Sequence, residues 1–376
     1  FALFVAERGT ATKEVVYVLE RQGFIRPHMA DENDKRTIYM VDMHEPLMFL
    51  HNLDTTIKEP FASNPAVLDA VEKNHKKLQI AMTKLYPGNL VLSLSSGIMY
   101  HRLVDRITAL NDVPREPLVP RRLGKNMCVP FGKILRGKVV PNTVTKTLHT
   151  DKVYEPDLNS FTIEPFPYYS PLKSQIETIK SFDRPVILVD DLVHKADRLQ
   201  VLVPQLREDG IPIRKVVVGV LSGYGRDLMQ CLKVPVESIY SMPNLRQWFV
   251  ESTLYPFIGG DTVRREEMKV AGLQPSINMI LPYATPRLSG CSREALVEFS
   301  ACCIENSRDL FQVLEAEYRK MYAKNLTLSR LSEAVILPLC PDKGSCMEYD
   351  ENLAASVYLE NDLETLWRMK EFLIKG

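Results

Sequence analysis

One short segment constrains the fold of this chain more than any other. Val186–Val189 is fully apolar, and two acids, Asp190 and Asp191, follow it directly. An apolar run of this length predicts a strand that is buried on both faces of a parallel sheet. A helix is expected over 199–209 and a second buried strand over 215–221. This alternation predicts an α/β fold with a mostly parallel, Rossmann-like sheet and helices on both faces.

Two acids at the end of such a strand are in the place where open parallel sheets bind ligands. Asp190 and Asp191 are therefore candidates to hold Mg²⁺ through water or to accept hydrogen bonds from ribose hydroxyls. The loop 194–198 opens the next helix, and free N–H groups at a helix start suit a phosphate. The alternative is that the acids cap a helix or lie at a solvated strand tip.

The segment from Asn64 to about 110 has the same alternation. Asn64 and Pro65 are expected to cap and begin a helix that ends at Pro87-Gly88. A strand over 89–94 then leads into the small-residue turn Ser95-Ser96-Gly97 and a second amphipathic helix. This order is typical of half of a doubly wound unit, although any strand-to-helix turn favours small residues.

In these motifs the sequence resembles the type I phosphoribosyltransferases and the phosphoribosyl pyrophosphate synthetases, over roughly residues 64–262. In that family Ser95, Ser96 and Gly97 correspond to the pyrophosphate loop, and the excursion 137–160 corresponds to the mobile hood. The resemblance implies a glycosyltransferase-type site in which Asp190 and Asp191 orient the ribose and Mg²⁺. The implied ligand is a phosphorylated ribose or a nucleotide.

The phosphate loop departs from the family pattern. Where the family has threonine and glycine, this chain has larger or charged residues: His194, Lys195, Ala196, Asp197 and Arg198. Side chains obstruct the approach of phosphate to backbone N–H groups, and Asp197 adds repulsion, whereas Lys195 and Arg198 can supply charge instead. The two hypotheses are a working transferase and a catalytically degenerate module that senses a ligand or contacts another domain. Pro204 is a second departure, because proline inside a helix costs about 3 kcal/mol or produces a kink.

Both ends of the chain differ in character from the α/β region. Residues 1–45 have a strand, helix, Gly-Phe, strand order that resembles the last third of an acetyl-CoA-dependent N-acetyltransferase, without its upstream pyrophosphate loop. An ornament packed on the next domain is the alternative. Residues 263–376 are expected to be mainly helical, with helices over 292–323, 326–333 and 353–372. The expected domains are thus 1–45, 62–262 and 263–376.

Composition limits the class of partner. The 47 basic residues balance the 47 acidic ones, so nucleic acid and an anionic membrane are not expected partners. No apolar stretch is long enough to span a bilayer, and a cytoplasmic location is expected. The spacing of the seven cysteines fits reduced thiols. The helical region is expected to cover the α/β domain or to mediate self-association. The expected protein partners are a second copy of the chain, as a homodimer, or domains upstream of Phe1.

Overall fold

The structure is a computed structural model, and it describes most of the chain. The described residues are 2–7, 26–30, 36–119, 122–135, 137–167, 169–265, 270, 272–286, 288, 290–343 and 348–375. The chain divides into two compact units, of which unit 1 comprises 1–93 and 246–376 and unit 2 comprises 94–245. Among the described residues, no helix is both long and apolar enough to cross a membrane.

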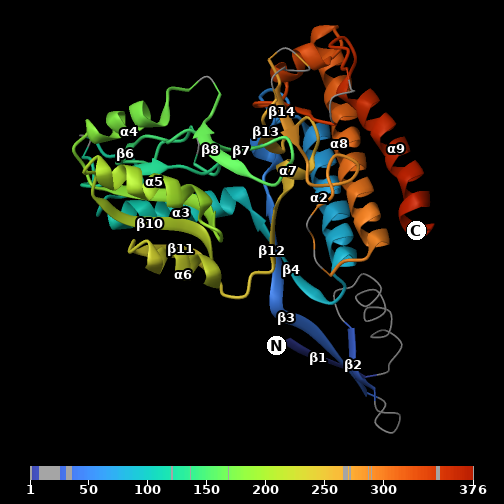
Figure 1. Ribbon diagram of the computed structural model, residues 1–376, viewed down its shortest axis with the longest axis horizontal. Coiled ribbons are helices and arrows are strands. Elements are labelled where there is room, and N and C mark those ends of the chain that lie inside the picture. The colour runs from blue at the N-terminus through green and yellow to red at the C-terminus, as the bar shows by residue number, and fades with distance from the viewer. Residues whose placement is uncertain are drawn as a thin grey trace. The chain divides into compact units, whose positions relative to one another are not determined.

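Unit 2 is built on a five-stranded parallel sheet with the order β11-β10-β9-β5-β6, so β9 is the central strand. Figure 1 labels β6, β10 and β11 of this sheet. The strands are β5 (Met127–Pro130), β6 (Val144–Thr145), β9 (Val186–Val193), β10 (Ile213–Ser222) and β11 (Val236–Met242). The helices of the unit are α3 (Ser96–Leu110), α4 (Leu172–Lys180), α5 (Asp197–Glu208) and α6 (Gly223–Cys231). The expected α/β class with a mostly parallel sheet is confirmed.

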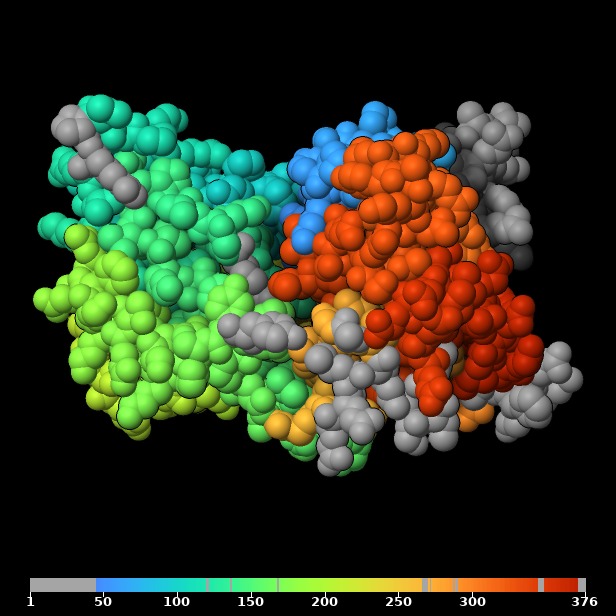
Figure 2. Space-filling model, turned by 90° about the horizontal axis from the view of Figure 1, so that it is seen from above, coloured from blue at the N-terminus to red at the C-terminus, as the bar shows by residue number. Residues whose placement is uncertain are grey.

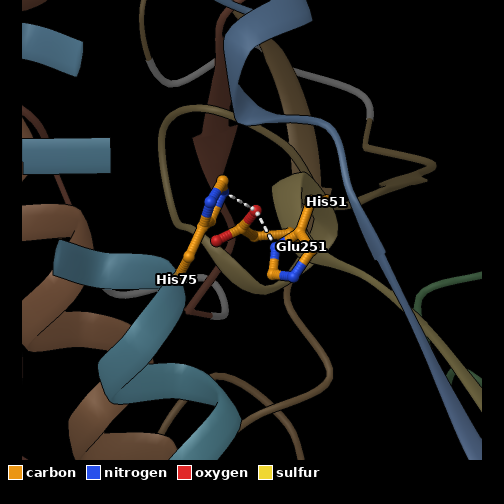
Figure 3. Close-up of side chains that lie close together, drawn as sticks. All are labelled: His51, His75 and Glu251. Carbon is orange, nitrogen blue, oxygen red and sulfur yellow. Dashed lines mark hydrogen bonds and ion pairs between the residues drawn. The ribbon is translucent and has the colours of Figure 1, made fainter. Parts of the chain in front are cut away.

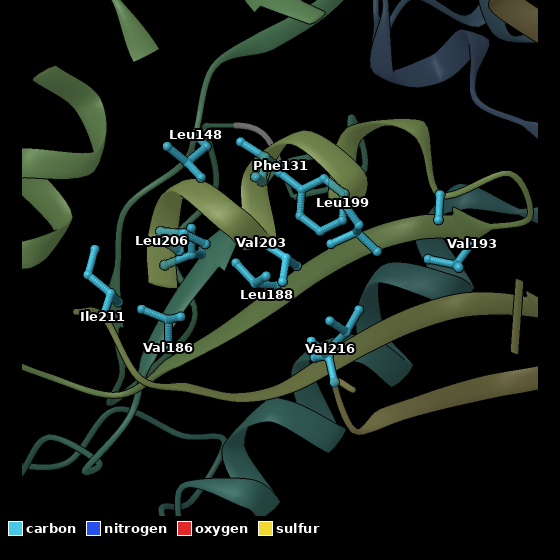
Figure 4. Packing of buried hydrophobic residues seen from close by; sticks show 14 of the residues in the cluster. Phe131, Leu148, Val186, Leu188, Val193, Leu199, Val203, Leu206, Ile211 and Val216 are labelled. Atoms are coloured by element: carbon cyan, nitrogen blue, oxygen red, sulfur yellow. The ribbon is translucent and has the colours of Figure 1, made fainter. Parts of the chain in front are cut away.

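The core of unit 2 forms where α5 covers β9. Val186 and Leu188 are fully buried, and Leu199, Val203 and Leu206 of α5 pack against them (Figure 4). The apolar positions of α5 recur every three or four residues, which places them on one face of the helix. This packing fixes the start of α5 beyond the end of β9, and with it the loop 194–196.

One expectation for this segment is corrected. The strand does not end at the acids, because β10 pairs with β9 as far as Leu221 and Val193 and gives the residues beyond Asp191 a ladder partner. Pro204 lies inside α5, and the helix nevertheless continues to Glu208. Its side chain is exposed, so the proline ring does not disturb the packed face.

A β-ribbon, β7 (Thr150–Tyr154) and β8 (Phe161–Pro165), lies in the excursion expected as the hood. The two strands are antiparallel, with Lys152 opposite Ile163. The ribbon belongs to unit 2.

Unit 1 contains a sheet organised on the long strand β3 (Arg36–His51). Its other strands are β1 (Ala2–Glu7), β2 (Arg26–Ala30), β4 (Asn89–Ser95) and β12 (Gln247–Val250). β1 and β2 are antiparallel to β3, whereas β12 is parallel to it, with Leu47 opposite Gln247. The helix of the strand, helix, Gly-Phe, strand order expected in residues 1–45 lies outside the described residues.

Two segments differ from expectation in this sheet. The segment from His44 to Ser63 carries several prolines and lacks a clear period, which predicts a connection. Its first part, residues 44–51, instead continues β3, because β12 supplies hydrogen-bonding partners and Leu47–Leu50 are buried. The doubly wound order and the family resemblance predict that the strand before Ser96-Gly97 lies in the parallel sheet, next to the acid-bearing strand. This expectation is wrong, because β4 pairs with β3 instead.

The helices of unit 1 are α2 (Pro65–Leu85), α8 (Arg293–Tyr322) and α9 (Ala355–Lys375), and α8 contacts both of the others (Figures 1 and 2). The Asn64 side chain caps α2 by accepting from the N–H of Ala66 at 2.8 Å, as expected. Buried Asn74 and Asn306 exchange hydrogen bonds between α2 and α8, at 2.7 and 3.1 Å. These contacts put α2 in unit 1, although it was expected in the domain 62–262.

The remaining elements of unit 1 are short. They are the 3₁₀ helices η1 (Leu53–Thr55) and η2 (Leu328–Glu333), the helix α7 (Glu251–Leu254) and the strands β13 (Asp261–Val263), β14 (Gln274–Ile277) and β15 (Leu339–Pro341). The region 263–376 is thus mainly helical but also contributes strands. The helix expected over 292–323 is confirmed by α8, and η2 and α9 occupy the other two expected positions.

Candidate functional site

The two acids of β9 differ in their surroundings. The Asp190 side chain is buried, with 6% of the residue exposed, and its Oδ1 accepts the N–H of Asp191 at 2.8 Å. A Cβ added at Gly132, which follows β5, would collide with this carboxyl group. Asp191 is only partly buried, and its Oδ1 accepts the N–H of Leu192 at 3.1 Å.

Burial raises the pKa of Asp190 well above its usual value, and the neighbouring carboxylate of Asp191 raises it further, while the Arg198 guanidinium opposes both effects. Burial and the second carboxylate therefore both disfavour the charged form of Asp190. Mg²⁺ binds ionised carboxylates. Asp190 fits a direct magnesium ligand poorly, and the partly exposed Asp191 fits one better.

The loop after β9 has a backbone conformation that is normally reserved for glycine. Ala196 has a φ of 53°, in the left-handed region, and it immediately precedes α5. No side chain caps the first turn of α5. A left-handed residue before an uncapped helix forms a concave group of N–H donors that suits an anion. The backbone of the loop 194–198 therefore keeps a turn that glycine would favour, although the loop has larger side chains.

The two charged side chains at the start of α5 differ in their partners. Asp197 is the first residue of α5, and its Oδ2 lies 3.1 Å from Nζ of Lys152 on β7. The Arg198 Nε is buried and makes no hydrogen bond within the described part of the chain. The charge of Asp197 is thus already paired, whereas the Arg198 guanidinium retains an unused donor.

His194 lies on the side of the loop toward β10. Its Nδ1 is 2.8 Å from Oγ of Ser222, the residue that caps α6. Burial lowers the pKa of His194, and the charge of Lys195 lowers it further. The neutral imidazole is therefore favoured at neutral pH.

The turn expected to hold pyrophosphate is at the start of α3. Ser95 precedes the helix without capping it, and Ser96 and Gly97 are in its first turn. Ser96 is buried, and its Oγ has no hydrogen-bond partner among the described residues. α3 packs on β10 with Met99 against Gly219, where a Cβ would also approach the carbonyl of Asp191 at 2.7 Å. The turn 95–97 thus follows β4, which pairs with β3 and not with the parallel sheet. The helix that begins in this turn, α3, nevertheless packs beside β9 and β10.

A polar cluster around a buried carboxylate in unit 1 was not anticipated from the sequence. His51, His75 and Glu251 offer three metal-ligand atoms that all lie within 4.8 Å of one another. They come from β3, α2 and α7, and no short motif links them. Only the tertiary fold of unit 1 brings them together.

Comparisons with known proteins do not identify a family for this chain. No protein-family model matches the chain, and no curated protein matches it. Among the solved structures that match is the purine phosphoribosyltransferase from Pyrococcus horikoshii Ot3, with 12% sequence identity and a TM-score of 0.25. The match covers 41% of this chain and 86% of that protein. A likeness at this level does not by itself establish a shared function.

Proposed function

We propose that unit 2 binds a phosphorylated ribose, such as phosphoribosyl pyrophosphate or a nucleotide, at the end of β9. The phosphate occupies the start of α5, and the ribose hydroxyls face Asp191. The observation that carries this proposal is the left-handed Ala196 before the uncapped α5. That backbone geometry supplies several N–H donors to one anion, and each charge-assisted hydrogen bond contributes about 1.5–3 kcal/mol.

Arg198 and Ser96 support the same ligand class. Each has a buried polar atom without a hydrogen-bond partner among the described residues. A bound phosphorylated ligand would satisfy such atoms, and leaving them unpaired is costly. In this proposal Arg198 reinforces the phosphate site and Ser96 faces a leaving pyrophosphate.

In this proposal Asp191 is the residue that holds Mg²⁺. Its partly exposed carboxylate suits a water-coordinated Mg²⁺ bound together with the pyrophosphate oxygens. Asp190 acts as a buried neighbour whose Oδ1 accepts the backbone N–H of Asp191. It does not act as a second metal ligand.

A degenerate module without turnover is the second candidate function, and the ion pair between Lys152 and Asp197 favours it. Asp197 puts a carboxylate at the start of α5, where it repels an incoming phosphate, and it engages the nearest lysine of the ribbon. We therefore expect weak binding of phosphoribosyl pyrophosphate and no transfer to common purine or pyrimidine bases.

Calorimetry of the full chain with phosphoribosyl pyrophosphate and Mg²⁺ tests the proposal. Asp191→Asn is expected to weaken binding at least tenfold, whereas Asp183→Asn, which removes an exposed carboxylate before the opposite end of β9, is expected to leave it unchanged. Equal affinities for the wild type and Asp191→Asn would place the ligand elsewhere. Turnover with any base would favour the working transferase over the degenerate module.

A further inference from the structure

In unit 1, two histidines enclose a buried carboxylate. Glu251 is the first residue of α7, and its side chain is 0% exposed. Its Oε2 lies 3.3 Å from Nδ1 of His51 and 2.6 Å from Nε2 of His75 (Figure 3). The three side chains converge from β3, α2 and α7 on one point.

We propose that His51, His75 and Glu251 bind a Zn²⁺ ion. Two imidazoles and one carboxylate form the donor set of zinc sites that keep a fourth position open. At bond lengths of about 2.1 Å, ligands on one tetrahedral zinc lie about 3.4 Å apart. The donor atoms here are all within 4.8 Å of one another, so small side-chain adjustments bring them onto one ion.

Without a metal ion, one buried nitrogen of the cluster lacks a hydrogen bond, and the buried carboxylate is paired with imidazoles alone among the described residues. His75 Nε2 is buried and makes no hydrogen bond of acceptable geometry, although it lies 2.6 Å from the carboxylate oxygen. A buried carboxylate also requires a compensating positive charge. Among the described residues, the ion pairs of Glu251 are with these two imidazoles alone. A divalent cation would satisfy the His75 nitrogen and the Glu251 charge together.

Neighbouring polar groups hold the ligands in place. The second nitrogen of His51 contacts Ser93 Oγ and lies 3.2 Å from Nε2 of Gln79. On the carboxylate, Oε1 accepts from the Tyr255 hydroxyl at 3.3 Å, which leaves Oε2 to the histidines. Partners of this kind orient ligands in zinc sites, and their loss typically weakens metal binding about 10–100-fold.

The two histidines leave the cluster partly accessible to solvent. The side chains of His51 and His75 are 14% and 24% exposed, whereas Glu251 is fully buried. Three protein ligands with one accessible position are typical of catalytic rather than structural zinc, because water completes the coordination. The competing arrangement is ion-free, with His51 donating Nδ1–H to Glu251.

Titration of the full chain with Zn²⁺ after chelation and dialysis tests the site. We expect about one equivalent to bind with submicromolar affinity, and at least 100-fold weaker binding in His75→Ala and Glu251→Gln. His101→Ala is the matched control, because this exposed histidine of α3 is not part of the cluster. Ser93→Ala is expected to weaken binding about tenfold.

Cobalt substitution of the wild-type chain keeps the test independent of variant folding. Intense visible bands of four- or five-coordinate Co²⁺, without a near-ultraviolet thiolate band, are expected. A pale six-coordinate spectrum or a thiolate band would contradict the assignment. Less than 0.1 equivalent of bound Zn²⁺, or unchanged affinity in folded His75→Ala and Glu251→Gln, would also overturn it.

Discussion

Lys152 Nζ lies 3.1 Å from Asp197 Oδ2, so a lysine of the β7–β8 ribbon neutralises the acid at the first position of α5. The ribbon occupies the excursion that the sequence suggested as a mobile hood. The ion pair therefore connects that hood directly to the loop proposed to bind phosphate.

Removing the Asp197 charge is expected to tighten binding of phosphoribosyl pyrophosphate at least tenfold. Asp197→Asn removes a repulsion at the helix start and releases Lys152 to pair with the phosphate. The double variant Asp197→Asn, Lys152→Met should lose most of this gain. Calorimetry with Mg²⁺ measures both, and a gain that survives loss of Lys152 would show that the lysine does not contact the ligand.

Substitutions at position 196 test whether this residue has a left-handed backbone conformation. An L-residue in this conformation costs about 1–2 kcal/mol, and glycine removes this cost while adding about 0.4–1 kcal/mol of unfolded-state entropy. Ala196→Gly is therefore expected to raise the free energy of unfolding by about 0.5 kcal/mol, and Ala196→Val to lower it by more than about 1 kcal/mol. Urea denaturation checks both. Clear destabilisation by glycine would mean that residue 196 is not left-handed.

Replacing Pro204 tests how much this proline destabilises α5. Its missing N–H leaves the carbonyl of Gln200 without its helical partner, and its side chain is exposed. Pro204→Ala is expected to stabilise the chain by about 1–3 kcal/mol. A matched change on the same helix, Gln205→Ala, should alter stability by less than about 0.5 kcal/mol. No gain in urea denaturation from Pro204→Ala would indicate that the proline is strain-free.

The raised pKa of Asp190 makes stability depend on pH. An unfolded aspartate loses its proton near a pH of about 3.9, whereas folded Asp190 retains its proton to higher pH. Its contribution to stability is present below the unfolded pKa and is lost as pH rises through the folded pKa. Asp190→Asn mimics the protonated form, so its stability relative to the wild type should increase from pH 4 to pH 8. A difference that stays constant over this range would show that Asp190 is ionised throughout.

Local sequence patterns predicted the elements of unit 2 that surround the acids. Val186–Val189, the amphipathic face of α5 and the buried run in β10 are short-range signals, and each formed as expected. The end of β9 was misplaced because the pairing of Val193 with Leu221 depends on the length of a strand elsewhere in the chain. Side-chain chemistry marked Asp190 as a ligand, but its burial against Gly132 appears only in the fold.

The strand pairing in the unit 1 sheet and the histidine cluster could not be predicted from the sequence. β4 was assigned to the parallel sheet because strand, turn and helix follow one another there, yet its partner is β3. His51, His75 and Glu251 are on separate elements, and Glu251 is far along the chain from both histidines. No periodicity relates such residues, and only the pairing of β3 with β12 brings His51 toward the start of α7.

Binding of phosphoribosyl pyrophosphate and Mg²⁺ to the wild type, Asp191→Asn and Asp197→Asn, measured in one calorimetric series, tests the central claim most directly. The account predicts weak, saturable binding to the wild type, at least tenfold weaker binding to Asp191→Asn, and at least tenfold tighter binding to Asp197→Asn. Affinities that do not differ among the three proteins, or no binding even to Asp197→Asn, would contradict it.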